Sequence, residues 1–137
     1  HLSIRRQRQM CIRDSDTHVL LWVHTKPSRL GKKTRHALAS EGGVFFSPIS
    51  VFEWFQKDGL DGLSAKDLVA ATKSVGFQEL PLGLDAILDV PRFGALRDRD
   101  PMDLLLMSQA AAGRMHFYTA DRFLLELGLD FVKDAEA

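Results

Sequence analysis

Four carboxylates are the side chains in this sequence best suited to chemistry. They lie far apart along the chain, at Asp16, Glu53, Asp103 and Asp121. Carboxylates that share one cleft repel one another, and a hard divalent cation such as Mg²⁺ removes that penalty by binding their oxygens. A bound cation of this kind polarises a phosphoryl group and lowers the pKa of a water molecule. The four acids therefore raise the hypothesis of a magnesium site that acts on phosphate esters.

Three of these acids also have a purely structural explanation. Asp16 and Asp121 can be helix N-caps, which accept hydrogen bonds from free backbone N–H groups. Asp103 lies three residues after Asp100, which precedes Pro101 and is a strong N-cap candidate. Asp103 would then lie in the first helical turn, where the macrodipole favours a negative charge.

Glu53 is the hardest of the four to explain structurally. It interrupts the apolar stretch Val51–Phe55, and a buried carboxylate without a partner is very costly. An ion pair with Lys57, one helical turn later, is the structural alternative.

Other chemistries have little support in the sequence. It contains no Gly-x-Ser-x-Gly, no His-Glu-x-x-His and no Gly-x-x-x-x-Gly-Lys phosphate loop. The single cysteine, Cys11, can form neither an internal disulfide nor a Cys-rich zinc site, and it fits a reducing, cytoplasmic compartment. With 137 residues, 45% hydrophobic, and no long apolar run, the chain has the composition of one globular domain without a membrane span.

The elements that must position the acids alternate between strands and helices. Strands are predicted over 44–46, 77–80, 116–119 and 129–132. Helices are predicted over 28–39, 48–57, 64–74, 84–90, 101–112 and 121–127, with a charged loop over 92–99. Such alternation favours an α/β fold with a parallel sheet covered on both faces. Sites in these folds lie outside the carboxyl ends of the strands, where we expect the four acids to meet.

Residues 1–15 differ from the rest of the chain. They are polar and basic, lack a helical or strand period, and are predicted to be a non-native or disordered leader, which leaves 16–137 as a single domain. The alternative is a basic arm that contacts nucleic acid.

Four segments resemble, in order, the motifs of PIN-domain nucleases. They read Asp-Thr-His-Val-Leu-Leu-Trp (16–22), Ser-Pro-Ile-Ser-Val-Phe-Glu (47–53), Arg-Asp-Pro-Met-Asp-Leu-Leu-Leu (99–106) and Thr-Ala-Asp-Arg (119–122). The resemblance covers residues 16–133, and the most similar branch is the VapC-type toxins of toxin–antitoxin pairs. In that family an apolar strand precedes the first aspartate, and here only Met10–Ile12 could supply it.

This resemblance implies a three-layer α/β/α sandwich with a central parallel sheet. It also implies a Mg²⁺- or Mn²⁺-dependent endoribonuclease, a homodimer, and a small antitoxin protein that packs over the site. The metal-binding catalytic acids would be Asp16, Glu53, Asp103 and Asp121. Asp100, Thr17 and Thr119 would support them by hydrogen bonding. Phosphates of the RNA could be bound by Arg97, Arg99, Arg114 or Arg122.

Two other functions stay open. Asp14-Ser15-Asp16-Thr17 matches the Asp-x-Asp-x-Thr motif of haloacid dehalogenase-like phosphatases. A catalytically inactive PIN domain that binds another protein is the second. Trp54, Phe55 and Leu60 are expected in the core, and an exposed aromatic cluster at these positions would instead mark a partner surface. His18 and His24, on either side of Trp22, are expected on a helix face rather than as metal ligands.

Overall fold

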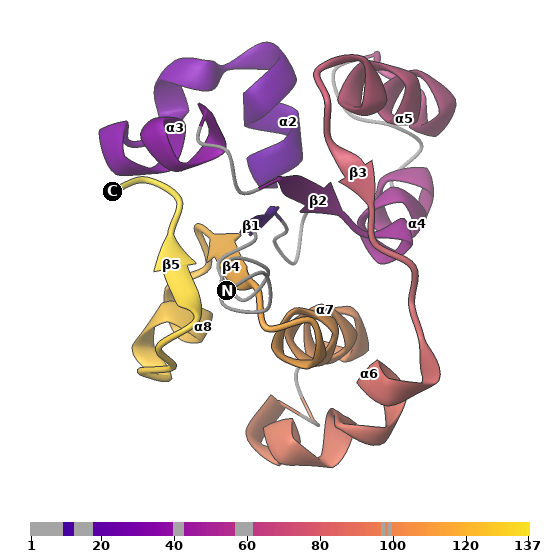
Figure 1. Ribbon diagram of the computed structural model, residues 1–137, viewed down its shortest axis with the longest axis vertical. Coiled ribbons are helices and arrows are strands. Elements are labelled where there is room, and N and C mark those ends of the chain that lie inside the picture. Colours follow the sequence, from indigo (N-terminus) through magenta and orange to yellow (C-terminus); the bar gives the residue numbers. More distant parts are fainter. Residues whose placement is uncertain (1–9, 13–17, 40–42, 57–61, 97, 99) are drawn as a thin grey trace.

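Short parallel strands form the centre of the structure (Figure 1). The computed structural model describes residues 10–12, 18–39, 43–56, 62–96, 98 and 100–137. Its strands pair in the order β3-β2-β1-β4-β5, and every pair is parallel. They are β1 (Met10–Ile12), β2 (Val44–Phe46), β3 (Gln78–Glu79), β4 (His116–Thr119) and β5 (Val132–Asp134). The predicted α/β class with parallel strand pairing is confirmed.

Strand β1 lies inside the segment that the sequence predicts as a leader. Its residues nevertheless pair on both sides: Met10 is in register with Val44 of β2 and with His116 of β4. Three residues are too few to show a period, and strand formation depends on the neighbouring strands more than on intrinsic preference. Met10–Ile12 therefore belongs to the sheet, and the other leader residues, 1–9 and 13–15, lie outside the described part of the chain.

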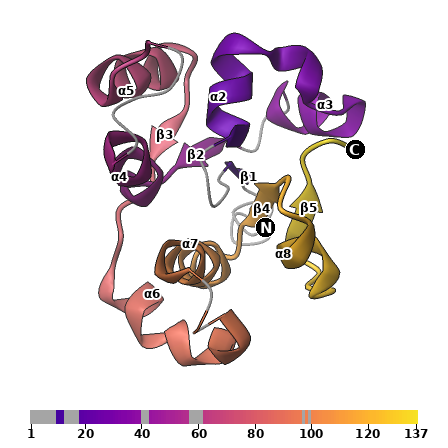
Figure 2. The ribbon, with the colours of Figure 1, turned by 180° about the vertical axis from the view of Figure 1, so that it is seen from behind.

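One face of the strands is covered by α2 (His18–Thr25), the short 3₁₀ helix η1 (Pro27–Arg29), α3 (Lys32–Ala39) and α5 (Ala65–Ser74). Their buried apolar side chains, among them Leu20 and Leu68, pack with Val44 and Phe46 of β2 and with Tyr118 of β4. Packing in this core holds α2 and α3 against the strands. Both views show the two helices on the same side of the strands (Figures 1 and 2).

The opposite face is covered by α7 (Pro101–Ala112), α8 (Arg122–Glu126) and the 3₁₀ segment η2 (Val90–Leu96), with α6 (Leu84–Leu88) packed against α7. Phe117 and Val132 pack here with Leu106 and Leu124. Neighbouring residues of β4 thus enter different cores, because successive side chains of a strand point to opposite faces. Helix α4 (Pro48–Gln56) contributes to both cores, through Trp54 to the first and Ile49 to the second.

Local capping interactions explain where several helices begin. Ser64 accepts a hydrogen bond from the backbone N–H of Asp67 at 3.1 Å, and Asp100 accepts one from Met102 at 2.9 Å. These bonds satisfy backbone donors that have no partner within the helix. Both caps match the sequence prediction. Within the described ranges, no helix has the length and apolar character that crossing a bilayer requires.

The structure corrects the prediction of a continuous helix from Ser28 to Ala39. Ser28 lies in η1, Leu30 is extended with ψ 133°, and α3 begins only at Lys32. The start of α3 is set by a distant segment, because the carbonyl oxygen of Ala137 accepts hydrogen bonds from the backbone N–H groups of Lys33 and Thr34 at 3.1 and 3.4 Å.

Two further elements differ in position from the prediction. The predicted loop over 92–99 overlaps η2, whose two short 3₁₀ pieces extend to Leu96 and are separated by a kink at Phe93. The last strand occupies Val132–Asp134 instead of 129–132, because the N–H of Val132 donates to the carbonyl of Leu129 in a turn, at 3.1 Å. The apolar pattern of residues 129–132 comes from packing against the second core and not from strand pairing.

Candidate functional site

The strand order reverses between β1 and β4. The strand that follows β1 in the sequence, β2, pairs on one side of β1. The strand that follows β4, β5, lies in the opposite direction along the sheet. In α/β sheets, ligands bind outside the carboxyl ends of the strands at such a reversal. The segment that follows β1 contains Asp16 and Thr17, which lie outside the described residues. The segment that follows β4 contains Asp121.

Asp121 is held in place by two hydrogen bonds at this edge. Its backbone N–H donates to the hydroxyl oxygen of Thr119 at 3.0 Å, and its own carboxylate accepts from the N–H of Phe123 at 2.9 Å. Thr119 is fully buried at the end of β4. The predicted N-cap role of Asp121 is therefore confirmed. Thr119 supports the backbone of Asp121 through this bond, and its expected hydrogen-bonding role toward the metal-binding acids stays a prediction.

Glu53 lies on α4, which starts directly after β2 at the same edge. The hydroxyl oxygen of Ser47 accepts a hydrogen bond from the N–H of Ile49 at 3.1 Å, which fixes the turn from strand to helix. Glu53 is only 5% exposed. It lies one turn after Ile49, on the side of α4 that packs with α7.

Asp103 lies in the first turn of α7 and is 1% exposed. Since α7 leads back into the parallel strand β4, its first turn is at the carboxyl edge of the sheet. Asp103 is one turn before Met107, which shares a core with Ile49 of α4. Helices α4 and α7 are in contact, and each carries one of the two buried acids, Glu53 and Asp103.

The donor atoms at this edge fit a hard cation. Glu53 and Asp103 supply buried carboxylate oxygens, and Ser50 lies one turn before Glu53. Ser50 is fully buried, and its hydroxyl oxygen has no hydrogen-bond partner among the residues that the structure describes. Oxygen ligands of this kind are those that Mg²⁺ and Mn²⁺ prefer. The sequence analysis missed Ser50, although its spacing of three residues from Glu53 on a predicted helix is a usable signal.

The described residues do not by themselves form a complete metal centre. Within them, no group of three or more His, Cys, Asp or Glu side chains is arranged to hold a metal ion. Asp16, the remaining predicted ligand, is not among them. The four-carboxylate site therefore stays a prediction. The described structure brings together the helices that carry Glu53 and Asp103, and it positions Asp121 at the end of β4.

Arg114 and Arg122 are the two arginines predicted to bind phosphate that the structure describes, and they lie at opposite edges of the sheet. Arg97 and Arg99 lie outside the described part of the chain. Arg122 forms ion pairs with Asp134 at 3.2 Å and with Glu136 at 3.8 Å. Arg114 follows α7 and precedes β4, which puts it at the opposite, amino edge of the sheet.

The aromatic residues of α4 separate into core and surface. Trp54 is fully buried, and its indole N–H donates to the carbonyl of Leu63 at 2.7 Å. Phe55 was expected in the core but is 69% exposed, because it lies on the side of the helix opposite the sheet. Leu60 and Lys57 are outside the described residues, as are Asp14 and Ser15 of the alternative phosphatase motif.

The two histidines of α2 contact other side chains from the surface of the helix, in line with the predicted helix-face position. The ring of His18 stacks on Trp22 with centroids 6.1 Å apart. Nε2 of His24 is 2.9 Å from the hydroxyl oxygen of Thr72, and burial lowers the pKa of His24 below its usual value. Because the Thr72 hydroxyl donates to the carbonyl of Leu68 at 2.7 Å, the imidazole must be the donor in its bond with Thr72.

The sequence was compared with models of known protein families and with curated proteins, and no match was found in either comparison. No relative therefore assigns a role to Glu53, Asp103 or Asp121.

Proposed function

We propose that this chain is a metal-dependent endoribonuclease of the PIN type, with a three-layer α/β/α sandwich fold, and that it is the VapC-like toxin of a toxin–antitoxin pair. The observation that supports this most strongly is the burial of two carboxylates, Glu53 and Asp103, on helices packed against each other at the carboxyl edge of parallel strands. The four motif-like segments of the sequence agree with it.

Burial of two acids on two helices that contact each other has a physical consequence. A charged carboxylate loses its hydration in the interior, and a second negative charge nearby adds repulsion. A divalent cation offsets both terms. Glu53 and Asp103 would hold Mg²⁺ or Mn²⁺, with Asp16 and Asp121 as further ligands. When bound, the ion would supply Lewis-acid polarisation of a phosphodiester group and activation of water.

The surrounding residues keep this arrangement in place. Asp100 caps α7 and so sets the position of its first turn, which carries Asp103. Thr119 holds the backbone of Asp121 at the end of β4. Fixed positions matter because an ion bound by few carboxylates loses affinity when any one of them moves.

The test is cleavage of a mixed single-stranded RNA substrate by the purified chain. We expect cleavage with Mg²⁺ or Mn²⁺, none in excess EDTA, and a loss of at least about 100-fold in Asp103→Asn and Glu53→Gln. Asp67→Asn is the matched control, because Asp67 occupies the same position in the first turn of α5 as Asp103 does in α7, but is exposed. Cleavage that persists in EDTA and in Asp103→Asn would overturn the proposal. A chain that neither cleaves RNA nor binds Mn²⁺ would point to the inactive, protein-binding alternative.

The exposed aromatic side of α4 supports the partner part of the proposal. Phe52 and Phe55, three residues apart on the helix, are 48% and 69% exposed. Adjacent exposed aromatic residues of this kind mark protein interfaces. We assign this side of α4 to the homodimer and expect Phe55→Glu to be monomeric in analytical ultracentrifugation. An unchanged mass would remove this assignment and leave the antitoxin as the occupant to test.

A further inference from the structure

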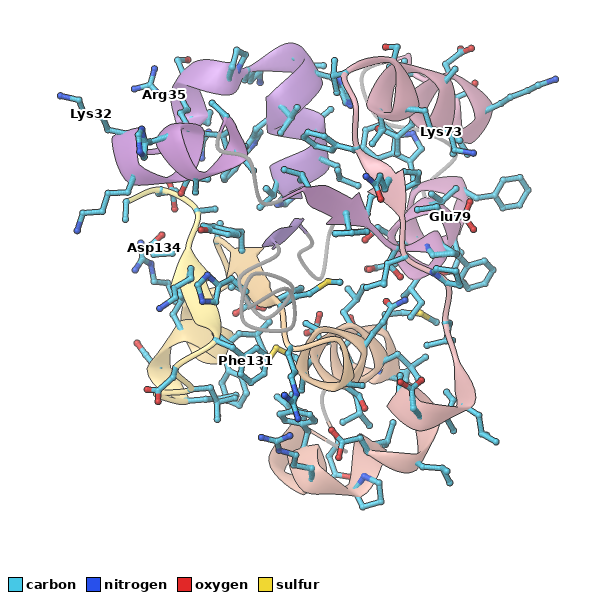
Figure 3. All side chains as sticks on the ribbon, viewed as in Figure 1. Lys32, Arg35, Lys73, Glu79, Phe131 and Asp134 are labelled. Carbon is cyan, nitrogen blue, oxygen red and sulfur yellow. The ribbon has the colours of Figure 1, made fainter. Side chains whose placement is uncertain are left out.

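A cavity of about 330 Å³ opens at the amino edge of the sheet, away from the candidate metal centre. It lies between the C-terminal end of α7, the start of β4 and the residues before β5. Its polar and aromatic lining comprises Arg92, Arg114, His116, Asp130 and Phe131. Figure 3 shows Phe131 beside β5. The volume is within the range of pockets that bind small ligands.

Arg114 has an unusual backbone conformation at the rim of this cavity. Helix α7 ends with two hydrogen bonds, from the N–H of Arg114 to the carbonyl of Ala111 at 3.1 Å and from the N–H of Met115 to Ala110 at 2.9 Å. This pattern requires a left-handed residue directly after the C-cap, where glycine is strongly favoured. Here the C-cap is Gly113 and the left-handed residue is Arg114, with φ 54°.

An arginine at a glycine position breaks a local rule of helix termination. Cations do stabilise helix C-termini, but any position in the last turn provides that benefit without left-handed strain. Strained residues that persist in a structure are concentrated at ligand sites. Arg114 also forms no ion pair within the described part of the chain, so no described carboxylate neutralises its guanidinium group.

The other polar and aromatic lining residues supply a second positive charge, a carboxylate, an imidazole and an aromatic ring. Arg92 adds a second guanidinium group, which lies 3.4 Å from the carboxylate of Asp89. Phe131 supplies an aromatic ring, whose position is set by an edge contact with Phe93, 6.0 Å between centroids. Asp130 offers an acceptor. Burial, and then the nearby charge of Lys133, lower the pKa of His116 below its usual value.

We propose that this cavity binds a nucleotide, whose phosphate group contacts Arg114 and Arg92 and whose base lies against Phe131. Guanidinium groups match the geometry of phosphate oxygens, and aromatic rings stack with any base. The nucleotide is either free or part of a single-stranded RNA. This inference does not depend on the proposed nuclease, because none of its residues belongs to the carboxylate edge.

Calorimetric titration of the full chain with adenosine 5′-monophosphate, and separately with a short single-stranded RNA, tests the proposal. We expect binding of at least one of the two, weakened about tenfold or more in Arg114→Gly. The same variant should unfold at an unchanged or higher temperature, since glycine relieves the left-handed conformation. If the ligand is a free nucleotide, the monophosphate should bind at least as tightly as the RNA. If the ligand is RNA, the RNA should bind more tightly than the monophosphate.

Three controls make the result decisive. Arg35→Ala removes an exposed positive charge from α3, which lies far from the cavity (Figure 3), and should leave affinity unchanged. Phe131→Leu should weaken binding of the monophosphate more than binding of inorganic pyrophosphate, which has no base. Excess EDTA should leave the affinity for the monophosphate unchanged, which separates this site from the proposed metal centre. Wild-type protein that binds neither probe, or an Arg35→Ala variant as weakened as Arg114→Gly, would overturn the proposal.

Discussion

The side chain of Thr119 and the backbone of Asp121 are joined by a hydrogen bond of 3.0 Å, in which the Asp121 N–H donates to the buried hydroxyl oxygen. This bond ties the last residue of β4 to the N-cap of α8. Since the Asp121 carboxylate also accepts from Phe123, both the backbone and the side chain of Asp121 are constrained. An acid at the carboxyl edge of the sheet is therefore held in one orientation without depending on a bound ion.

Substitution of Asp121 should separate capping from charge. Asp121→Asn keeps a capping oxygen, so we expect its free energy of unfolding to change by less than about 0.5 kcal/mol. Asp121→Ala removes the cap and should lower it by about 1 kcal/mol. RNA cleavage should be lost in both, because both lack the carboxylate. Urea unfolding and the cleavage assay measure the two effects, and Ser64→Ala, which uncaps α5, is the control that loses stability but retains cleavage. Wild-type cleavage by Asp121→Asn would exclude Asp121 from the metal ligands.

Removal of the Thr119 hydroxyl should destabilise the protein measurably. Thr119→Val preserves the shape of the buried side chain but leaves the N–H of Asp121 without its acceptor, which costs about 1–3 kcal/mol. The measurement is urea unfolding followed by circular dichroism. Thr25→Val, the same replacement on the exposed end of α2, should cost less than about 1 kcal/mol. Equal effects of the two substitutions would show that the Thr119 bond contributes nothing specific.

Divalent ions should stabilise the folded chain in a way that depends on Asp103. A ligand that binds only the folded state raises the melting temperature by mass action, so millimolar Mg²⁺ or Mn²⁺ should raise that of the wild type. Asp103→Asn should show no such rise, whereas Asp67→Asn should respond like the wild type. Differential scanning fluorimetry with and without EDTA makes the comparison. An identical rise in Asp103→Asn would place the ion elsewhere.

Trp54 should be among the residues most important for stability. It is fully buried, and its indole N–H donates to the carbonyl of Leu63, across a segment that connects α4 to α5. Trp54→Phe removes the donor and part of the packed volume, so we expect a loss of about 2–4 kcal/mol. Chemical denaturation can be followed by the fluorescence of Trp22, the other tryptophan. Phe55→Leu on the exposed side of α4 should change stability by less than about 0.5 kcal/mol, and a loss as large as that of Trp54→Phe would contradict the assignment of the core.

The stability of the fold should fall in mild acid because of partly buried histidines. Burial lowers the pKa of His24 below the usual histidine value of about 6.5. Burial, and then the positive charge of Lys133, lower the pKa of His116 in the same direction. Between the lowered and the usual pKa, the unfolded chain binds protons that the folded chain does not. The contribution of these histidines to stability is thus complete above about pH 6.5 and is lost as the pH falls below it. Urea unfolding from about pH 7.5 to about pH 5.5 should show this decrease, and it should be smaller in His24→Gln.

A matched histidine keeps that experiment interpretable. His36 lies exposed on α3, so His36→Gln should follow the wild-type pH profile. If His24→Gln and His36→Gln give the same profile as the wild type, the burial of His24 is not a source of the pH dependence.

Interactions between residues close in the sequence were predictable. Ser64 and Asp100 cap their helices as expected, and Asp121 caps α8, because a cap needs only a side chain and a backbone donor two or three residues later. The strands 44–46 and 116–119 match the prediction for a similar reason, since their apolar runs are bounded by turn residues. The chemistry suggested by Glu53 and Asp103 was also visible from residue type.

What depends on distant parts of the chain was decided only by the tertiary structure. Met10–Ile12 is a strand because β2 and β4 lie on either side of it, and α3 begins at Lys32 because Ala137 accepts its first backbone donors. The exposure of Phe55 and the cavity around Arg114 likewise follow from how elements pack. Residue types and short spacings thus determined the α/β class and the candidate acids by themselves. The element boundaries, the neighbours of each strand and the cavity at the amino edge required three-dimensional contacts, because no local pattern encodes a partner a hundred residues away.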